Sequence, residues 1–385
     1  MKSLPLAFFY LSILFRLVLS LSPTYLSCQL QKPTGESALA GCPEGTLYVS
    51  STDPSANFTG SSGGHQFSVS SAILIPRGSL MCNSPGTGKA VILIGEGQYF
   101  EMVNVTRGAP LVLLGQLDSA TASTRAGNAP QRNLVYIWNN LHAGNGLNDE
   151  ETPTLTVGPS DGHPFGNVDF KAYNIDFENR AANYSIAPAL VTSITLANTS
   201  FYGCAFASWQ DTWYAGYGSN TYVVDSTIYG QTDCKFFPSI PWFQSVTLAN
   251  RGCGGGITAW RGEPGTTNGV YIANSNITRS PDIDPTIVTT GRCFLGRPWN
   301  EYAVAVFLKN HMDDSIHPSG FTSWASGDAV PTTTFYAEFD SHGPGANMSS
   351  RVEQDHILSS EESQTHRLEE VFQERPRWID SRYQY

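Results

Sequence analysis

The chain has 385 residues, of which 36 are glycine and 23 are proline, and only 14% are charged. This composition favours a turn-rich all-β protein over helical bundles and coiled coils, and the length fits one elongated β domain. The net charge of −11 argues against a nucleic-acid partner, which would need a basic surface. A polyanionic substrate would therefore be held locally, by a few arginine and aromatic side chains.

The first twenty residues have the pattern of a secretory signal peptide. Lys2 precedes an apolar run, and Arg16 interrupts that run, so a membrane-spanning helix is not expected. The alternative is a buried N-terminal helix. Residues 21–44 are expected to form an N-terminal extension. Six Asn-X-Ser/Thr sequons agree with a secreted, extracellular glycoprotein: Asn57, Asn104, Asn183, Asn198, Asn276 and Asn347.

Seven cysteines permit disulfides outside the cell. They are Cys28, Cys42, Cys82, Cys204, Cys234, Cys253 and Cys293. Because the number is odd, at least one has no partner within the chain, and the spacing does not decide which cysteines pair. No pair has the spacing of a zinc site, so no metal is expected.

Short apolar strands separated by turn residues follow from residue 45 onward. They recur roughly every 20 residues, too far apart for a meander of tight hairpins, and helical periodicity is almost absent before Glu353. Strands are expected at 46–50, 72–75, 90–95, 111–115, 134–138, 168–179, 200–206, 222–230, 242–250 and 270–278. Without intervening helices, this spacing predicts a parallel β-helix, a solenoid in which each coil buries its inward face. An antiparallel sandwich is the alternative.

Two segments depart from the strand pattern. Residues 139–166 are rich in Asn and Gly, which is typical of a surface loop. Within the C-terminal tail, residues 346–385, the stretch 355–372 predicts a short helix with acidic residues near its start. We expect this tail to pack on the β-helix, at the open end of the solenoid. Neither segment is expected to be a separate domain.

Two carboxylates, Asp211 and Asp233, are separated by about one turn of a solenoid with roughly 20–30-residue coils. In such a fold their side chains would stack on neighbouring strands roughly 5 Å apart. Two neighbouring carboxyls cannot both ionise cheaply, so one stays protonated while the other stays charged. The pair could thus supply an acid and a nucleophile. Alternatively, each aspartate only caps a turn.

Five motifs extend this hypothesis. They are Gly-Gln-Tyr-Phe-Glu at 97–101, Gln-Asp-Thr-Trp-Tyr at 210–214, Gly-Gln-Thr-Asp at 230–233, Gly-Cys-Gly-Gly-Gly-Ile-Thr-Ala at 252–259 and Leu-Gly-Arg-Pro-Trp at 295–299. Their order and spacing resemble those of the pectin methylesterases (pectinesterases), and the second and fifth look like the fungal branch of the family. The resemblance covers about residues 46–340. It implies a right-handed, single-stranded parallel β-helix, with residues 45–345 as the catalytic domain.

The resemblance also implies roles for individual residues. Asp233 would be the nucleophile, and Asp211 the general acid and base. Arg297 would keep Asp233 charged through a bidentate contact, and Gln210 would donate a hydrogen bond to the developing oxyanion. The implied reaction converts methyl-esterified pectin (homogalacturonan) to pectate and methanol through an acyl-enzyme, without metal or organic cofactor.

Four aromatic residues are expected to bind the polysaccharide: Trp299, Trp213, Tyr214 and Phe236. The two tryptophans would stack on sugar rings, although each could instead belong to the core. Pectin is the expected partner, and the chain is expected to act as a monomer without a membrane partner.

Two departures from the family pattern bear on activity. Ile186 stands where the family has a Gln that helps form the oxyanion hole, and one such donor is worth about 3 kcal/mol of transition-state stabilisation. After the nucleophile, the run Cys234, Lys235, Phe236, Phe237 places Phe237 at a family glycine, which narrows the cleft, and brings the charge of Lys235 close to Asp233.

These departures keep a non-catalytic polysaccharide-binding relative open as an alternative. A second alternative is another β-helix enzyme that acts on pectin, either a lyase or a polygalacturonase. It is disfavoured because a lyase needs a Ca²⁺ site of clustered carboxylates, and a glycosidase gives no reason for the Arg-Pro-Trp motif. An ordinary serine esterase finds no support, since no Gly-X-Ser-X-Gly motif is present.

Overall fold

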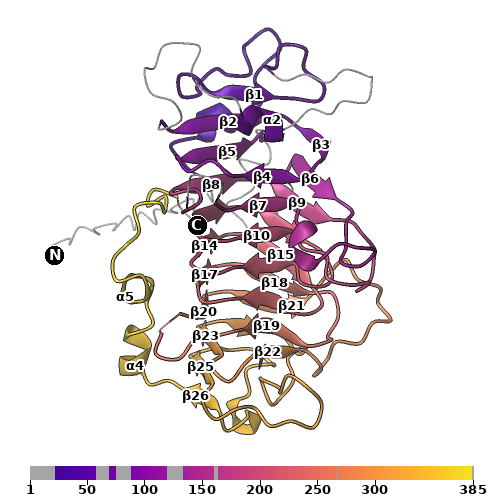
Figure 1. Cartoon of the computed structure of the whole chain (residues 1–385), viewed down its shortest axis with the longest axis vertical. Helices are drawn as coiled ribbons and strands as arrows, with labels where there is room; N and C mark the ends of the chain where they lie inside the picture. The colour runs from indigo at the N-terminus through magenta and orange to yellow at the C-terminus, as the bar shows by residue number, and fades with distance from the viewer. Residues whose placement is uncertain are drawn as a thin grey trace, which may run out of the picture.

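The computed structural model describes residues 22–57, 69–74, 88–118, 133–159, 164–266 and 268–383. These residues form a solenoid of stacked coils whose strands lie in three parallel sheets (Figure 1). The described part of each central coil gives one strand to each sheet, as β11, β12 and β13 do before β14, β15 and β16 repeat the sequence. The predicted right-handed parallel β-helix is confirmed, and the antiparallel sandwich is excluded.

The three sheets differ in length. The 11-stranded sheet has the order β1 (Leu47–Val49), β2 (Ala90–Ile94), β5 (Leu111–Gly115), β8 (Phe170–Tyr173), β11 (Asn198–Tyr202), β14 (Asn220–Val224), β17 (Ile240–Gln244), β20 (Val270–Ala273), β23 (Val304–Leu308), β25 (Phe335–Phe339) and β26 (Asp355–Ile357). The 8-stranded sheet has the order β24 (His311–Met312), β21 (Asn276–Arg279), β18 (Thr247–Asn250), β15 (Thr227–Gly230), β12 (Ala205–Ala207), β9 (Asp176–Asn179), β6 (Val135–Asn139) and β3 (Gly97–Phe100). The 7-stranded sheet, which carries the candidate site, has the order β22 (Phe294–Pro298), β19 (Gly256–Trp260), β16 (Cys234–Phe236), β13 (Trp213–Ala215), β10 (Thr192–Ile194), β7 (Leu155–Val157) and β4 (Val103–Val105).

A sharp corner separates the 11-stranded sheet from the 8-stranded one. The residue after the first strand adopts a left-handed conformation, as in Asn174 (φ 57°), Asp225 (φ 51°) and Asn274 (φ 49°). Asn and Asp tolerate this conformation better than other non-glycine residues. This explains why so many of the predicted strands contain Asn, Gly or Asp at the same point.

Inward-facing side chains stack in register along the solenoid axis and form its core. Phe201, Val223, Phe243 and Ile272 are partners on successive strands of the 11-stranded sheet, and all are buried. Because side chains alternate between the two faces of a strand, the neighbouring positions point outward. The core therefore runs as one continuous apolar column through the coils.

One predicted strand is wrong. Residues 72–75 were expected in a strand, but α2 (Val69–Leu74) is a helix. The buried residues Val69, Ala72 and Ile73 have the i, i+3, i+4 spacing of one helical face. The Glu101 carboxylate accepts hydrogen bonds from the Val69 and Ser70 amides at 3.0 and 3.2 Å, which satisfies the first turn.

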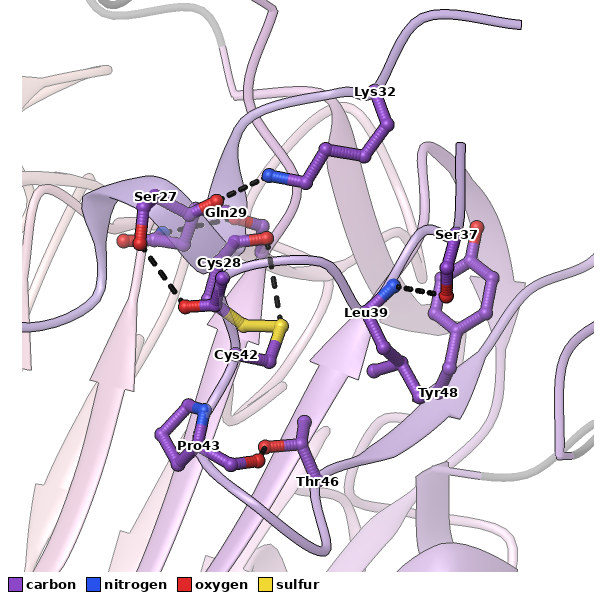
Figure 2. Close-up of a disulfide and its surroundings, with 12 residues drawn as sticks. Ser27, Cys28, Gln29, Lys32, Ser37, Leu39, Cys42, Pro43, Thr46 and Tyr48 are labelled. Atoms are coloured by element: carbon purple, nitrogen blue, oxygen red, sulfur yellow. Dashed lines mark hydrogen bonds between the residues drawn. A yellow bond between two sulfur atoms is a disulfide. The ribbon is translucent and has the colours of Figure 1, made fainter. Parts of the chain in front are cut away.

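Both terminal segments cover the outer face of the 11-stranded sheet. That face carries a second buried apolar cluster with many aromatic members, Tyr173, Tyr202, Tyr222, Trp242 and Tyr271 among them. At the N-terminal side, α1 (Leu26–Gln29) is tied to the chain before β1 by the Cys28–Cys42 disulfide (Figure 2).

The C-terminal tail, residues 346–385, begins with the 3₁₀ helix η2 (Met348–Ser350) and β26. It continues through α4 (Ser360–Gln364) and α5 (Leu368–Val371), where a single short helix was expected at 355–372. From α4 onward it runs back along the side of the solenoid (Figure 1), whereas its first residues, Ala346 and Val352 among them, pack against the inner core. Asp380 accepts hydrogen bonds from Ser22 Oγ at 2.6 Å and Tyr173 Oη at 2.9 Å. The two ends of the described chain therefore meet on this sheet.

A second disulfide joins Cys253 to Cys293. Cys204 and Cys234 are unpaired among the described residues, and Cys82 lies outside them, as does the expected signal peptide. Within the described part of the chain, no helix is long and apolar enough to cross a membrane.

Candidate active site

Asp211 and Asp233 occupy equivalent points of two adjacent coils. Each precedes a strand of the 7-stranded sheet, β13 and β16 respectively, and each has a left-handed backbone, with φ of 59° and 54°. A parallel bridge pairs Gln210 with Thr232, and the Asp211 amide donates to the Thr232 carbonyl at 3.1 Å. The chain thus brings the two carboxylates to neighbouring positions on the solenoid.

Arg297 holds Asp233 through both carboxylate oxygens. Its Nε donates to Oδ1 at 2.9 Å and its Nη2 donates to Oδ2. The side chain reaches across β19, where the residue in register is the small Ala259. Gly255 is also required here, because a Cβ would lie 2.9 Å from Asp233 Oδ1 and 3.0 Å from Arg297 Cζ. This bidentate contact fixes the orientation of the Asp233 carboxylate.

Asp211 has a different environment. Its side chain is fully buried, and this burial raises the pKa of Asp211 to about 7, although Lys235 Nζ lies only 2.6 Å from Oδ2 and opposes the shift. The negative charges of Asp233 and Asp149 raise this pKa further. Near neutral pH, Asp211 can therefore exist with or without its proton.

Lys235 is not placed as the sequence predicted. It was expected close to Asp233, but its ammonium lies between Asp211 Oδ2 at 2.6 Å and Asp149 Oδ2 at 2.5 Å. Burial alone would lower the pKa of Lys235, but its two carboxylate partners raise it above the usual value. Lys235 therefore stays charged, and it acts on the candidate acid and not on the candidate nucleophile.

An acidic turn brings Asp149 to the site. Residues 139–166 were expected to be a surface loop, but this range contains the strand β7 of the 7-stranded sheet, so the expectation is wrong there. The 3₁₀ helix η1 (Asp149–Glu151), in the same range, contacts two strands of that sheet. Besides the Asp149–Lys235 ion pair, Glu150 Oε1 accepts a hydrogen bond from Tyr214 Oη at 2.7 Å. The acidic run at 149–151 was visible in the sequence, but no motif connected it with the site.

Gln210 is oriented by a neighbouring coil. Its Oε1 accepts a hydrogen bond from Ser185 Oγ at 2.9 Å, and its Nε2 has no hydrogen-bond partner among the described residues. The amide is thus left as a donor. At the position next to Ser185, Ile186 is 39% exposed and has no polar side-chain atom. Gln210 therefore has no second side-chain donor at that position to assist it.

Four aromatic rings form a row beside the carboxylates. Tyr214 contacts Phe237 with ring centroids 5.4 Å apart, Phe237 contacts Trp299 at 5.0 Å, and Trp299 stacks on Trp324 at 6.0 Å. Trp324 is 39% exposed and lies 4.1 Å from the Arg297 guanidinium. The sequence analysis missed Trp324, which belongs to no recognised motif.

Two of the expected substrate-binding residues face the other way. The side chains of Trp213 and Phe236 are 0% and 1% exposed and belong to the solenoid core. Trp213 packs edge-on against Phe206, and Phe236 stacks on Trp260. Neither can offer a ring face to a sugar, so this expectation is corrected. Their neighbours Tyr214 and Lys235 point outward because side chains alternate along a strand.

Comparisons with known proteins agree with this geometry. A family model described as Pectinesterase matches residues 159–373. Probable pectinesterase A of Neosartorya fischeri is 30% identical over 262 residues, which covers 68% of this chain and 73% of that protein. The chain belongs to the pectinesterase family.

Other members of this family show the same relationship. Probable pectinesterase A of Aspergillus niger is 29% identical over 299 residues, covering 77% of this chain and 82% of that protein. A probable pectinesterase/pectinesterase inhibitor of Arabidopsis thaliana is 30% identical over 280 residues, but this chain spans only 48% of its length. The crystal structure of a pectin methylesterase from Aspergillus niger superposes with a TM-score of 0.66 at 24% identity, covering 89% of this chain and 98% of that one.

The matched region of this pectinesterase contains both aspartates, Gln210 and Arg297, together with the two departures at Ile186 and Lys235. Among the described residues, no group of three or more His, Cys, Asp or Glu side chains could hold a metal ion.

Proposed function

We propose that this pectinesterase hydrolyses the methyl esters of pectin, with Asp233 as nucleophile and Asp211 as general acid and base. One observation carries the proposal: two carboxylates on adjacent coils have opposite environments. Asp233 is clamped by a bidentate arginine, while Asp211 is fully buried and has a pKa raised to about 7. Such a division separates a charged nucleophile from a protonated acid.

The first step of the reaction is acyl transfer to Asp233. Its carboxylate attacks the ester carbonyl of a galacturonate methyl ester, and the Gln210 amide donates to the developing oxyanion. Asp211 gives its proton to the methoxide as the C–O bond breaks, so methanol leaves. The product is an anhydride between the galacturonyl group and Asp233.

The second step reverses the role of Asp211. Now ionised, it takes a proton from water, and the resulting hydroxide attacks the acyl carbonyl. The anhydride bond breaks, the galacturonyl carboxylic acid is released, and Asp233 returns to its carboxylate form.

The row Tyr214, Phe237, Trp299 and Trp324 provides the surface on which we place the polysaccharide. Aromatic faces favour contact with sugar rings, and Trp299 and Trp324 stack with their planes only 5° apart. Tyr214 is nearly buried, so its contribution is mainly to the wall of the site. The methyl ester would lie beside this row, at the carboxylates of Asp211 and Asp233.

We also propose that the chain is secreted. Two disulfides among the described residues fit an oxidising compartment. Five of the six sequon asparagines are exposed, Asn57, Asn104, Asn183, Asn276 and Asn347, whereas Asn198 is half-buried. Glycans at the five exposed sites would not disturb the core.

Methanol release from highly methylated pectin tests the function. The wild type should release methanol, and Asp233→Asn should abolish release while circular dichroism and thermal unfolding remain those of the wild type. Asp284→Asn, at an exposed aspartate on another part of the surface, is the matched control and should keep activity. Retained activity in Asp233→Asn would refute the assignment. Pectin binding by the wild type without methanol release would support the alternative of a non-catalytic relative. Products that absorb in the ultraviolet would indicate a lyase.

A further inference from the structure

Lys235 and Arg297 stand in one row on the outer face of the 7-stranded sheet. Strand pairing aligns Lys235 with Ala259 and Ala259 with Arg297, so the two cations are two strands apart on the same face. Each contacts one of the two aspartates. Their situations differ in one respect: Arg297 has Asp233 as its carboxylate partner, whereas Lys235 is shared between Asp211 and a second carboxylate, Asp149.

Asp149 is held in place by its own turn. The backbone N–H of Asn148 donates to Glu151 Oε2 at 2.8 Å, and Thr152 Oγ1 donates to the backbone carbonyl of Asp149 at 2.8 Å. The Asn139 side chain then ties the Thr152 carbonyl to the solenoid at 3.0 Å. The side chain of Asp149 is 34% exposed, while that of Asp211 is 0% exposed. Asp149 therefore keeps part of its hydration while it shares the ammonium with Asp211.

The two roles proposed for Asp211 need opposite charge states. Methanol release needs its proton, and water activation needs its carboxylate. An ammonium at 2.6 Å favours the carboxylate alone, and would keep an unshared Asp211 ionised. A second carboxylate on the same ammonium weakens that preference and adds a repulsive negative charge.

We propose that Lys235 and Asp149 are a positioning pair for Asp211: Lys235 favours its ionised form, and Asp149 restores access to the protonated form by sharing the ammonium. This inference rests on the proposed function, since it explains how the charge state of Asp211, the proposed general acid, is controlled. The pKa of Asp211 near 7 agrees with a balance between the two forms.

Every charged group facing Asp211 enters this balance. Lys235 reaches it from β16, Asp233 from the turn before β16, and Asp149 from η1. Arg297 is engaged with Asp233. Removing Lys235 takes away the favourable charge, whereas removing Asp149 takes away a repulsive charge and leaves the ammonium to Asp211 alone. The two substitutions should therefore act in opposite directions.

The test compares the pH profiles of Lys235→Met and Asp149→Asn with that of the wild type. In Lys235→Met, the alkaline limb of kcat/KM should move to higher pH by about one unit or more, because an opposite charge at this range shifts a carboxyl pKa by about 1–3 units. In Asp149→Asn, the limb should move to lower pH. Glu150→Gln, on the same turn but bonded to Tyr214, is the matched control and should leave the limb in place.

If the two substitutions only disordered the site, kcat would fall in both variants, but the alkaline limbs of their pH profiles would not move in opposite directions. Shifts in the same direction, or no shift, would overturn the inference. A second readout does not require turnover: ¹³C NMR of the Asp211 carboxyl, assigned by its loss in Asp211→Asn, should titrate higher in Lys235→Met and lower in Asp149→Asn. If the wild type releases no methanol, the proposed function fails, and this titration still decides whether the pair controls Asp211.

Discussion

Arg297 and Asp233 form a fork-to-fork ion pair, with Nε donating to Oδ1 at 2.9 Å and Nη2 donating to Oδ2. Planar bidentate contact fixes the direction of the carboxylate as well as its charge. The guanidinium is itself fixed, because Nη1 donates to the Trp324 carbonyl at 3.2 Å and its plane lies over the Trp324 ring. The proposed nucleophile is therefore oriented by a residue that is itself held from two sides.

Arg297→Lys should keep a positive charge at Asp233 but lose the fork. Lysine offers a point charge and cannot reproduce two parallel hydrogen bonds. A misplaced nucleophile of this kind costs about 10²-fold in rate, so kcat should fall by about that factor with a smaller change in KM. Initial-rate measurements of methanol release check this. A kcat equal to that of the wild type would show that charge alone is enough.

Gln210→Ala should lower kcat by about 10²–10³-fold, the usual effect of removing one oxyanion donor. Ile186 provides no polar atom that could take over, so the loss should not be masked. Ser185→Ala removes only the hydroxyl that orients Gln210 Oε1 and should have a smaller effect on kcat. If both variants had normal kcat and KM values, the oxyanion would have to be stabilised by other groups.

The pH dependence follows from Asp211. Its pKa is raised to about 7, mainly by burial, and the proposed mechanism needs the proton for methanol release. Activity should therefore fall as the pH rises through about 7, because the acid becomes ionised in the free enzyme. The profile of kcat/KM against pH measures this limb. An activity that stays constant from pH 6 to about 9 would contradict the role of Asp211 as general acid.

Arg351 supports the C-terminal end of the solenoid and not the site. It contacts Glu338 Oε1 at 2.5 Å and Asp355 Oδ2 at 3.7 Å, and all three side chains are buried. Arg351→Met would leave two carboxyls buried without a cation, at a cost of about 3–5 kcal/mol in the free energy of unfolding. Urea denaturation measures this. Adding Glu338→Gln should restore part of the loss, and stability equal to the wild type in Arg351→Met would disprove the argument.

Much of the fold could be predicted from local patterns. Short apolar strands, separated by turn residues and repeated at the length of a coil, describe a solenoid because each of these features acts within one coil. The strand predicted at 72–75 was wrong because that prediction also used only local patterns. An apolar run of this length suits either a strand or a buried helical turn, and the distant carboxylate of Glu101 favoured the helix.

The order of the site residues along the chain was also sufficient to bring Asp211, Asp233 and Arg297 together, since parallel coils stack residues of equivalent position. It was not sufficient to orient their neighbours. Alternation requires Trp213 and Tyr214 to face opposite sides of the strand, but both are large aromatics, and only closure of the coil decides which one enters the core.

By itself, then, the sequence determined the coil length and the pairing of two carboxylates with an arginine. Only the tertiary structure decided that the Lys235 ammonium contacts Asp211 and not Asp233, and that Asp149, in the turn at 149–151, is the second carboxylate partner of Lys235. The physical reason is distance along the chain. Asp149 lies 86 residues from Lys235, and no local preference encodes a contact between a loop and a strand several coils away.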